Sequence, residues 1–211
     1  MIQRRSFILA SAAIADLPWT ALAAPTRTLR FVPQADLAVL DPILTTAGVT
    51  RSHAYLVFYT LYGVTGPEEG FRAVPQMAAG HRVDDDGRTW RISLRDGLFF
   101  HDGAKVLARD CVASIRRWGV RDTFGQALLA RADEISAADN TTIVFRMKRP
   151  FHLLPDALGK AAANVCAIMP ERLAATDPFK QVTEMVGSGP YRFKADERVQ
   201  GSRFVYERFA G

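Results

Sequence analysis

Residues 89–103 read TWRISLRDGLFFHDG, and this stretch decides the fold class of the 211-residue chain. Trp90, Ile92 and Leu94 alternate with polar residues, a pattern typical of a strand with one buried face. An aromatic turn follows and ends in the letters HDG, where Gly103 supplies the positive φ that such a turn needs. The segment therefore predicts a strand, with one apolar face, that leads into a tight turn.

The neighbouring segments supply a partner for this strand and a cover for its apolar face. Residues 81–90 read as a hairpin, because Asp86-Gly87 is a strong signal for a tight turn. Residues 108–120 predict a helix on which Val112, Ile115 and Trp118 share one side. We expect that side to pack against the apolar face of the strand, which gives a mixed α/β fold.

The same patterns predict the remaining elements of the chain. Alternating apolar residues predict a strand at 29–32 and a hairpin at 135–148. A continuous apolar run predicts a buried strand at 165–170, and paired strands are expected at 187–193 and 203–208. An apolar helix is expected from Ala54 to Tyr62, with Thr50 or Ser52 as its cap and Gly63 at its end. A short helix is expected over residues 153–160.

The N-terminus carries the features of an export signal. Arg4 and Arg5 precede the apolar run of residues 7–10, and Ala21-Leu22-Ala23 offers a cleavage site with small residues. The apolar run is too short to span a membrane. We therefore expect residues 1–23 to be a cleaved signal peptide and the protein to be periplasmic. The paired arginines followed by Phe7 also fit the twin-arginine export pattern, and the Sec route stays open beside it.

Composition excludes several classes of protein. The hydrophobic fraction is 48%, as in ordinary globular proteins, and the net charge is +5. The basic residues are scattered rather than gathered in a stripe, which argues against nucleic-acid binding. Cys111 and Cys166 stand in apolar surroundings and read as two buried thiols rather than a disulfide. No Cys or His spacing suggests a metal site, and we expect no cofactor.

The letters TWRISLRDGLFFHDG, followed by the helix that begins ARDCV, resemble the signature of the family 5 solute-binding proteins of ABC importers. A second mark of that family is the stretch GSGPYRF at residues 187–193, in which Ser188 replaces the usual Thr. Leu107 departs from the pattern, because the family usually has a capping Ser or Thr there. The resemblance implies a periplasmic-binding-protein-like fold that binds a small solute, performs no catalysis, and delivers the solute to membrane permease subunits.

The resemblance also implies a division of the chain. Residues 24–45 and 185–211 would form sheet segments of the first lobe, and residues 46–184 would form an inserted subdomain with connecting elements. Family members are generally more than twice as long as this chain. The resemblance therefore predicts a form truncated before the second lobe, with that lobe absent or encoded separately, and with impaired ligand binding.

Five residues are candidates for ligand contact. Hydroxyl groups can fix the orientation of a ligand and aromatic rings can supply contact area, which points to Thr45, Thr46, Tyr59, Ser188 and Tyr191. A peptide is the leading expectation for the ligand. Nickel chelates, haem, opines and sugars, which similar proteins also bind, remain open.

Two alternatives to solute binding stay open at this point. A secreted hydrolase could use His101 and Asp102 as a general base and its partner. However, no G-x-S-x-G motif accompanies the pair, so a role in closing a tight turn is favoured and no catalytic residue is predicted. The other alternative is an interaction or scaffold protein that uses the surface of the same lobe.

Overall fold

The structure is a computed structural model that describes residues 28–84 and 87–210. The chain divides into two units, Met1–Val32 and Pro33–Gly211. The predicted signal peptide, and Asp86 of the predicted hairpin turn, lie outside the described residues. Residues 29–32 form no strand, contrary to the sequence-based prediction. A strand requires a neighbouring segment that supplies hydrogen-bond partners, and none pairs with these residues among those described.

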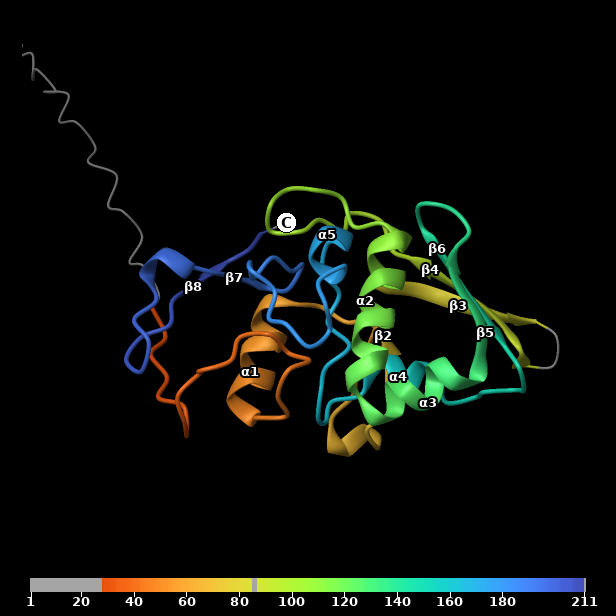
Figure 1. Cartoon of the computed structure of the whole chain (residues 1–211), viewed down its shortest axis with the longest axis horizontal. Helices are drawn as coiled ribbons and strands as arrows, with labels where there is room; N and C mark the ends of the chain where they lie inside the picture. The colour runs from red at the N-terminus through yellow and green to blue at the C-terminus, as the bar shows by residue number, and fades with distance from the viewer. Residues whose placement is uncertain (1–27, 85–86, 211) are drawn as a thin grey trace, which may run out of the picture. The chain divides into compact units, whose positions relative to one another are not determined.

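The second unit is a mixed α/β structure (Figure 1). Its helices are α1 (Gly48–Val57), α2 (Ala108–Arg121), α3 (Thr123–Arg131), α4 (Leu154–Gly159) and α5 (Glu171–Ala174), with the short 3-10 helices η1 (Pro67–Glu69) and η3 (Ala195–Glu197). Its strands are β1 (Tyr62–Val64), β2 (Ala73–Pro75), β3 (Ala78–Asp84), β4 (Thr89–Leu94), β5 (Ala132–Ala137), β6 (Thr142–Met147), β7 (Tyr191–Phe193) and β8 (Tyr206–Arg208).

The main sheet is antiparallel and has the strand order β3-β4-β6-β5, with α2 and α3 beside it (Figure 1). On β4 the side chains of Trp90, Ile92 and Leu94 are buried, while Arg91 and Ser93 are exposed. The three buried residues belong to one hydrophobic cluster with the apolar side of α2. The predicted hairpins at 81–90 and 135–148, the short helix near 153–160 and the helix beginning at Ala108 are confirmed.

Helix α2 begins without a side-chain cap from Leu107, as the sequence predicts. The carboxylate of Asp110 compensates, because Oδ2 accepts the Leu107 N–H at 2.8 Å. The other oxygen, Oδ1, accepts the N–H of Glu171 at 2.8 Å, at the start of α5. One buried carboxylate thus satisfies backbone donors at the starts of two helices, which favours both through the helix dipole.

A buried ion pair ties the loop before α1 to α2. Arg117 donates from Nη2 to Oδ2 of Asp41 at 2.8 Å and from Nη1 to Oδ1 at 3.2 Å. Asp41 Oδ2 also accepts the Val182 N–H at 3.0 Å, and Arg117 donates to the carbonyl oxygens of Thr176 and Lys180. These bonds satisfy both charged groups and hold two distant loops on one helix.

Helix α1 differs from its predicted bounds. It runs from Gly48 to Val57 and not to Tyr62, and neither Thr50 nor Ser52 caps it. Thr50 lies inside the first turn, where its hydroxyl donates to the carbonyl oxygen of Val39 at 2.7 Å. The helix ends early because tertiary bonds replace helical ones: the Val57 carbonyl accepts the Gly189 N–H at 2.9 Å. The next residues then continue in extended form toward β1.

Residues 165–170 are buried as predicted, but they form no strand. Their backbone bonds go to separate partners: Ile168 N–H donates to the Tyr59 carbonyl at 3.0 Å, and Met169 N–H donates to the Ser114 hydroxyl at 3.0 Å. The apolar character of residues 165–170 thus predicts their burial correctly, but the predicted strand is wrong because these residues pair with no neighbouring strand. Cys111 and Cys166 are free and buried, as predicted, and burial raises the pKa of both thiols.

A second hydrophobic cluster joins α1, the 165–174 segment and the β7–β8 pair. His53 contacts this cluster and is 2% exposed, with Nδ1 2.8 Å from the Tyr206 hydroxyl and its ring edge-on to Phe193. The β7–β8 pairing confirms the predicted strand pair near residues 187–208, in a shorter form. The division into first-lobe and inserted segments stays a prediction.

We predict that His53 makes stability fall in acid. Burial, assisted by the charge of Arg198, lowers the pKa of His53 from 6.5 to about 4. Between pH 6.5 and about 4, His53 is therefore protonated in the unfolded chain and neutral in the folded chain. The free energy of unfolding falls as the pH drops through this range, by at most about 1.4 kcal/mol per pH unit. Urea unfolding across the range should show a flatter dependence in His53→Gln. The exposed control His152→Gln should keep the wild-type slope; equal slopes in all three proteins would contradict the prediction.

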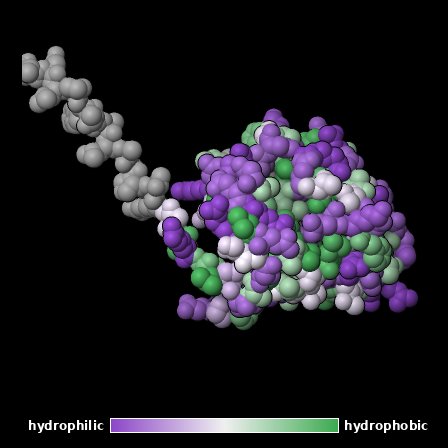
Figure 2. Space-filling model, turned by 60° about the vertical axis from the view of Figure 1, so that its left-hand side comes forward, coloured by the Kyte–Doolittle hydropathy of each residue, from purple (hydrophilic) through white to green (hydrophobic). Residues whose placement is uncertain are grey.

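The face shown in Figure 2 is largely hydrophilic and carries separate hydrophobic patches. Phe71, Leu153 and Phe179 are among the exposed apolar residues, and they lie far apart in the sequence. None of the helices within residues 28–84 and 87–210 has the length and apolar character needed to cross a membrane.

Candidate functional site

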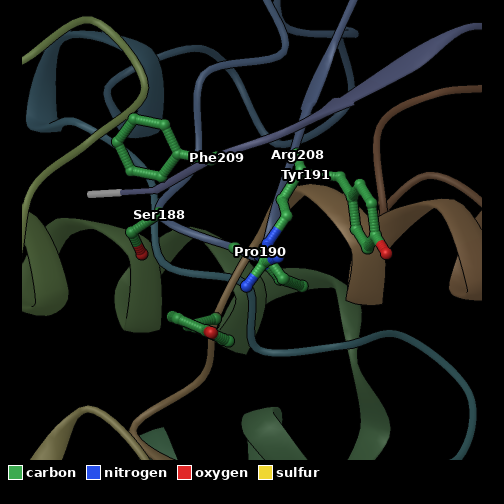
Figure 3. A pocket seen from close by; sticks show the side chains of 7 residues that line it. Ser188, Pro190, Tyr191, Arg208 and Phe209 are labelled. Carbon is green, nitrogen blue, oxygen red and sulfur yellow. The ribbon is translucent and has the colours of Figure 1, made fainter. Parts of the chain in front are cut away.

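A pocket of about 420 Å³ lies where the end of α1 meets the segment leading into β7 (Figure 3). Its lining includes three aromatic rings, two of them phenolic, with one serine hydroxyl and one cation; the lining residues are Tyr59, Ser188, Gly189, Pro190, Tyr191, Arg208 and Phe209. Tyr191 and Arg208 are exposed, whereas Ser188 is buried. A solute in this pocket would therefore contact aromatic and polar groups and still touch solvent on one side.

Two glycines allow the wall of the pocket to form. A Cβ atom at Gly187 would lie 2.0 Å from the carbonyl oxygen of Val57, and one at Gly189 would lie 2.6 Å from the Val57 carbonyl carbon. The Gly189 N–H donates to that same Val57 carbonyl at 2.9 Å. Only residues without a side chain permit this backbone-to-backbone approach, which sets Ser188 and Pro190 beside the end of α1.

We predict that Gly187→Ala destabilises the protein by about 1–3 kcal/mol or more, because the new methyl group meets backbone that cannot rotate away. Gly66→Ala is the matched control, since no atom lies within 4 Å of its added Cβ and its φ is negative. Thermal unfolding of both variants measures the difference. Equal melting temperatures for the two would show that the close approach carries no energetic weight.

The turn at residues 101–103 is hydrogen-bonded to the glycine segment of the pocket wall. Gly103 has a φ of +86°, and its N–H donates to the Phe100 carbonyl, so the predicted tight turn is confirmed. His101 donates its backbone N–H to the Gly187 carbonyl at 2.8 Å, and its Nε2 lies 2.9 Å from the Gly189 carbonyl oxygen. Since a carbonyl only accepts, Nε2 carries the proton. The histidine thus fixes both glycines of the pocket wall.

This geometry does not support a hydrolase that uses His101 and Asp102. The Asp102 carboxylate accepts the Ala104 N–H at 3.1 Å and pairs with Arg172 at 3.1 Å, so it does not orient the imidazole. The Nδ1 atom of His101 is buried without a hydrogen-bond partner among the described residues. Burial lowers the pKa of His101, which favours its neutral form in this structural position.

The structure brings three of the five sequence-predicted ligand residues together: Tyr59, Ser188 and Tyr191 all line the pocket. Thr45 and Thr46 do not line it. The Thr45 hydroxyl accepts the Ala47 N–H at 3.2 Å at the start of α1, and Thr46 is exposed. Their contact with a ligand stays a prediction.

The sequence reasoning missed Arg208 and Phe209. The sequence did predict that residues 187–193 and 203–208 pair as strands, and this pairing sets Arg208 opposite Tyr191. A residue opposite a candidate on a paired strand is itself a candidate, so the signal was present. No group of three or more His, Cys, Asp or Glu side chains in the described part of the chain could hold a metal ion.

Comparison with known proteins identifies the family to which the chain belongs. Residues 72–211 match the bacterial extracellular solute-binding proteins, family 5. The chain belongs to this family. Membership confirms the family resemblance read from the 89–103 and 187–193 motifs, together with the expected fold class. It also agrees with the prediction that the protein is not an enzyme, since the family is one of solute-binding proteins.

Curated family 5 relatives cover most of the chain. A probable peptide ABC transporter periplasmic-binding protein of Sinorhizobium fredii is 41% identical over 189 residues, which are 90% of this chain and 34% of the relative. A glutathione-binding protein of Pectobacterium atrosepticum is 27% identical and covers 82% of this chain and 32% of its own length. The chain spans about a third of the length of these relatives.

Solved family structures share the fold. The periplasmic binding protein DppA of Helicobacter pylori, in complex with the peptide STSA, superposes with a TM-score of 0.67 at 20% identity. The match covers 83% of this chain and 38% of that protein. At this identity the likeness establishes the periplasmic-binding-protein-like fold alone.

Proposed function

We propose that this chain contributes to the solute-binding component of an ABC importer, which binds a peptide or a similar small solute in the periplasm and delivers it to membrane permease subunits. The pocket next to β7 is the proposed contact surface. The observation that carries the proposal is that Tyr59, Ser188 and Tyr191, three candidates from the sequence, meet in one pocket of a family 5 protein. The 41% identity to a probable peptide-binding relative favours a peptide.

The exposure of the pocket to solvent determines the affinity that we expect for a solute. Aromatic faces supply contact area and hydroxyl groups supply orientation, as in small-molecule sites generally. Because Tyr191 and Arg208 are exposed, a solute held only by these seven residues would keep part of its surface in water. We therefore propose that the chain alone binds weakly, with a Kd on the order of millimolar.

The proposal includes export by a cleaved signal peptide at residues 1–23. Its support is the pair Arg4 and Arg5, the apolar run and the Ala21-Leu22-Ala23 stretch, together with membership of a family of extracellular proteins. Mass spectrometry of the protein recovered from the periplasm should find Ala24 at the N-terminus. Recovery there with Met1 intact would contradict cleavage, and export that survives replacement of both arginines by lysine would indicate the Sec route.

Binding is tested by NMR titration of the isotopically labelled chain with short peptides. We expect saturable shifts of the backbone amides of Ser188, Gly189 and Tyr191. Tyr191→Ala should weaken binding several-fold through loss of ring contact. The control is Tyr55→Ala on α1, because Tyr55 is equally exposed, at 38%, and lies outside the pocket. Absence of saturable shifts at the pocket, or equal effects of the two variants, would contradict the proposal.

The alternative of an interaction or scaffold protein gains no support from the comparisons, since the relatives reported above are solute-binding proteins.

A further inference from the structure

Arg208 is the charged residue of the pocket lining. It lies on β8, directly opposite Tyr191 of β7 in the antiparallel register. Figure 3 shows its side chain running from β8 toward Pro190, so that the guanidinium nitrogens lie among the labelled lining residues. The strand pairing thus places a positive charge at the pocket.

In the described part of the chain, no carboxylate forms an ion pair with Arg208, and its guanidinium makes no hydrogen bond. Other exposed arginines do have such partners: Arg172 binds Asp102 and Glu184 at 3.1 and 3.0 Å. A second cation adds to the charge, since the Arg192 guanidinium lies 5.5 Å from the ring centre of Phe209, which lines the pocket.

Three carbonyl oxygens and one amide of the pocket wall are already engaged within the protein. The carbonyl groups of Gly187 and Gly189 are engaged by His101, and that of Pro190 accepts the Phe209 N–H at 2.9 Å. The Gly189 N–H is used by Val57. Among the side chains of the lining, Arg208 is the strongest donor available to an anionic solute.

We infer that the pocket takes a solute bearing a carboxylate and that Arg208 binds this carboxylate. The inference rests on the proposed solute-binding function and names the chemistry of its ligand. A guanidinium presents paired N–H donors that match the two oxygens of a carboxylate. The rings of Tyr59, Tyr191 and Phe209 supply apolar contact for the rest of such a molecule. A neutral solute would leave the charge of Arg208 without a partner.

The experiment compares two probes that differ at a single group: N-acetyl-alanyl-phenylalanine, with a C-terminal carboxylate, and its neutral C-terminal amide. Both are titrated into the labelled full chain at low salt, and Kd values come from the shifts of pocket amides. Wild type should bind the acid about five- to tenfold more tightly than the amide. Arg208→Gln should bring this ratio close to one and leave the affinity for the amide unchanged. Arg203→Gln, at an exposed arginine outside the pocket lining, should keep the wild-type ratio.

The outcomes separate the two levels of the proposal. Equal affinity of wild type for acid and amide, or an equal loss of both in Arg208→Gln, would overturn the carboxylate role and leave the pocket as a solute site. A changed ratio in Arg203→Gln as large as that in Arg208→Gln would also overturn it, because the effect would then be one of net charge. Absence of saturable pocket shifts with both probes would overturn the proposed function and the inference with it.

Discussion

Replacing Arg117 with methionine is expected to lower the free energy of unfolding by about 3–5 kcal/mol, the usual cost of breaking a buried ion pair from one side. The side chains of Arg117 and Asp41 are 2% and 0% exposed, so the remaining carboxylate would lie uncompensated in the interior. The carbonyl oxygens of Thr176 and Lys180 would lose a charged donor as well. Each buried group left without a partner adds to the loss.

Urea unfolding followed by circular dichroism measures this effect. The matched control is Arg146→Met, because Arg146 makes an equally short ion pair with Glu134 at 2.8 Å, but its side chain is 55% exposed. Exposed pairs contribute little, so the control should unfold almost as wild type does. The double variant Asp41→Leu/Arg117→Met should recover part of the stability, since it removes both buried charges. Similar losses in Arg117→Met and Arg146→Met would contradict the prediction.

Elements whose signals are local were predicted well from the sequence. The alternation around Trp90 and the helical spacing of Val112 and Ile115 each lie within a few residues, and both elements form as predicted. The tight turn at Gly103 is equally local, because the φ of +86° there is a property of one residue. In these cases local preference and the tertiary structure agree.

Elements whose limits depend on distant partners were predicted less well. Helix α1 ends at Val57 because Gly189, far along the chain, donates to its carbonyl, and no pattern within residues 54–62 contains that information. Residues 165–170 are apolar enough for a strand, yet their amides bond to groups from α2 and from the segment after α1. The Asp41–Arg117 ion pair joins residues from two distant segments, and no pattern of neighbouring residues in the sequence predicts it.

The candidate site shows the same division. Ser188 and Tyr191 stand in one short motif, and Tyr59 stands in the aromatic run for which the sequence predicts a helix end; the structure places all three at one pocket. Arg208 required the register of β7 and β8, which fixes its position opposite Tyr191. A sequence pattern can thus suggest which residue types suit a ligand, whereas their convergence depends on strand pairing.

Trp90→Ala is expected to cost about 3–5 kcal/mol, the range for removing a well-buried aromatic side chain. Trp90 is 4% exposed, and it packs in the cluster that joins β4 to Ile115 and Trp118 of α2. Its indole N–H also donates to the Gly87 carbonyl at 3.2 Å, and its ring centre lies 4.9 Å from that of His81. Truncation therefore removes contacts on both the helix side and the hairpin side and leaves a cavity between sheet and helix.

The neighbouring residue on the same strand provides the control for this prediction. Arg91 points to the opposite face, has a side chain that is 43% exposed, and only approaches Asp84 at 3.6 Å. Arg91→Ala should therefore cost far less than Trp90→Ala in the same urea unfolding experiment. Because adjacent strand positions share the backbone and differ in the face they present, the comparison isolates burial from strand propensity. Equal losses at the two positions would show that the stability of this sheet does not depend on the apolar face that α2 covers.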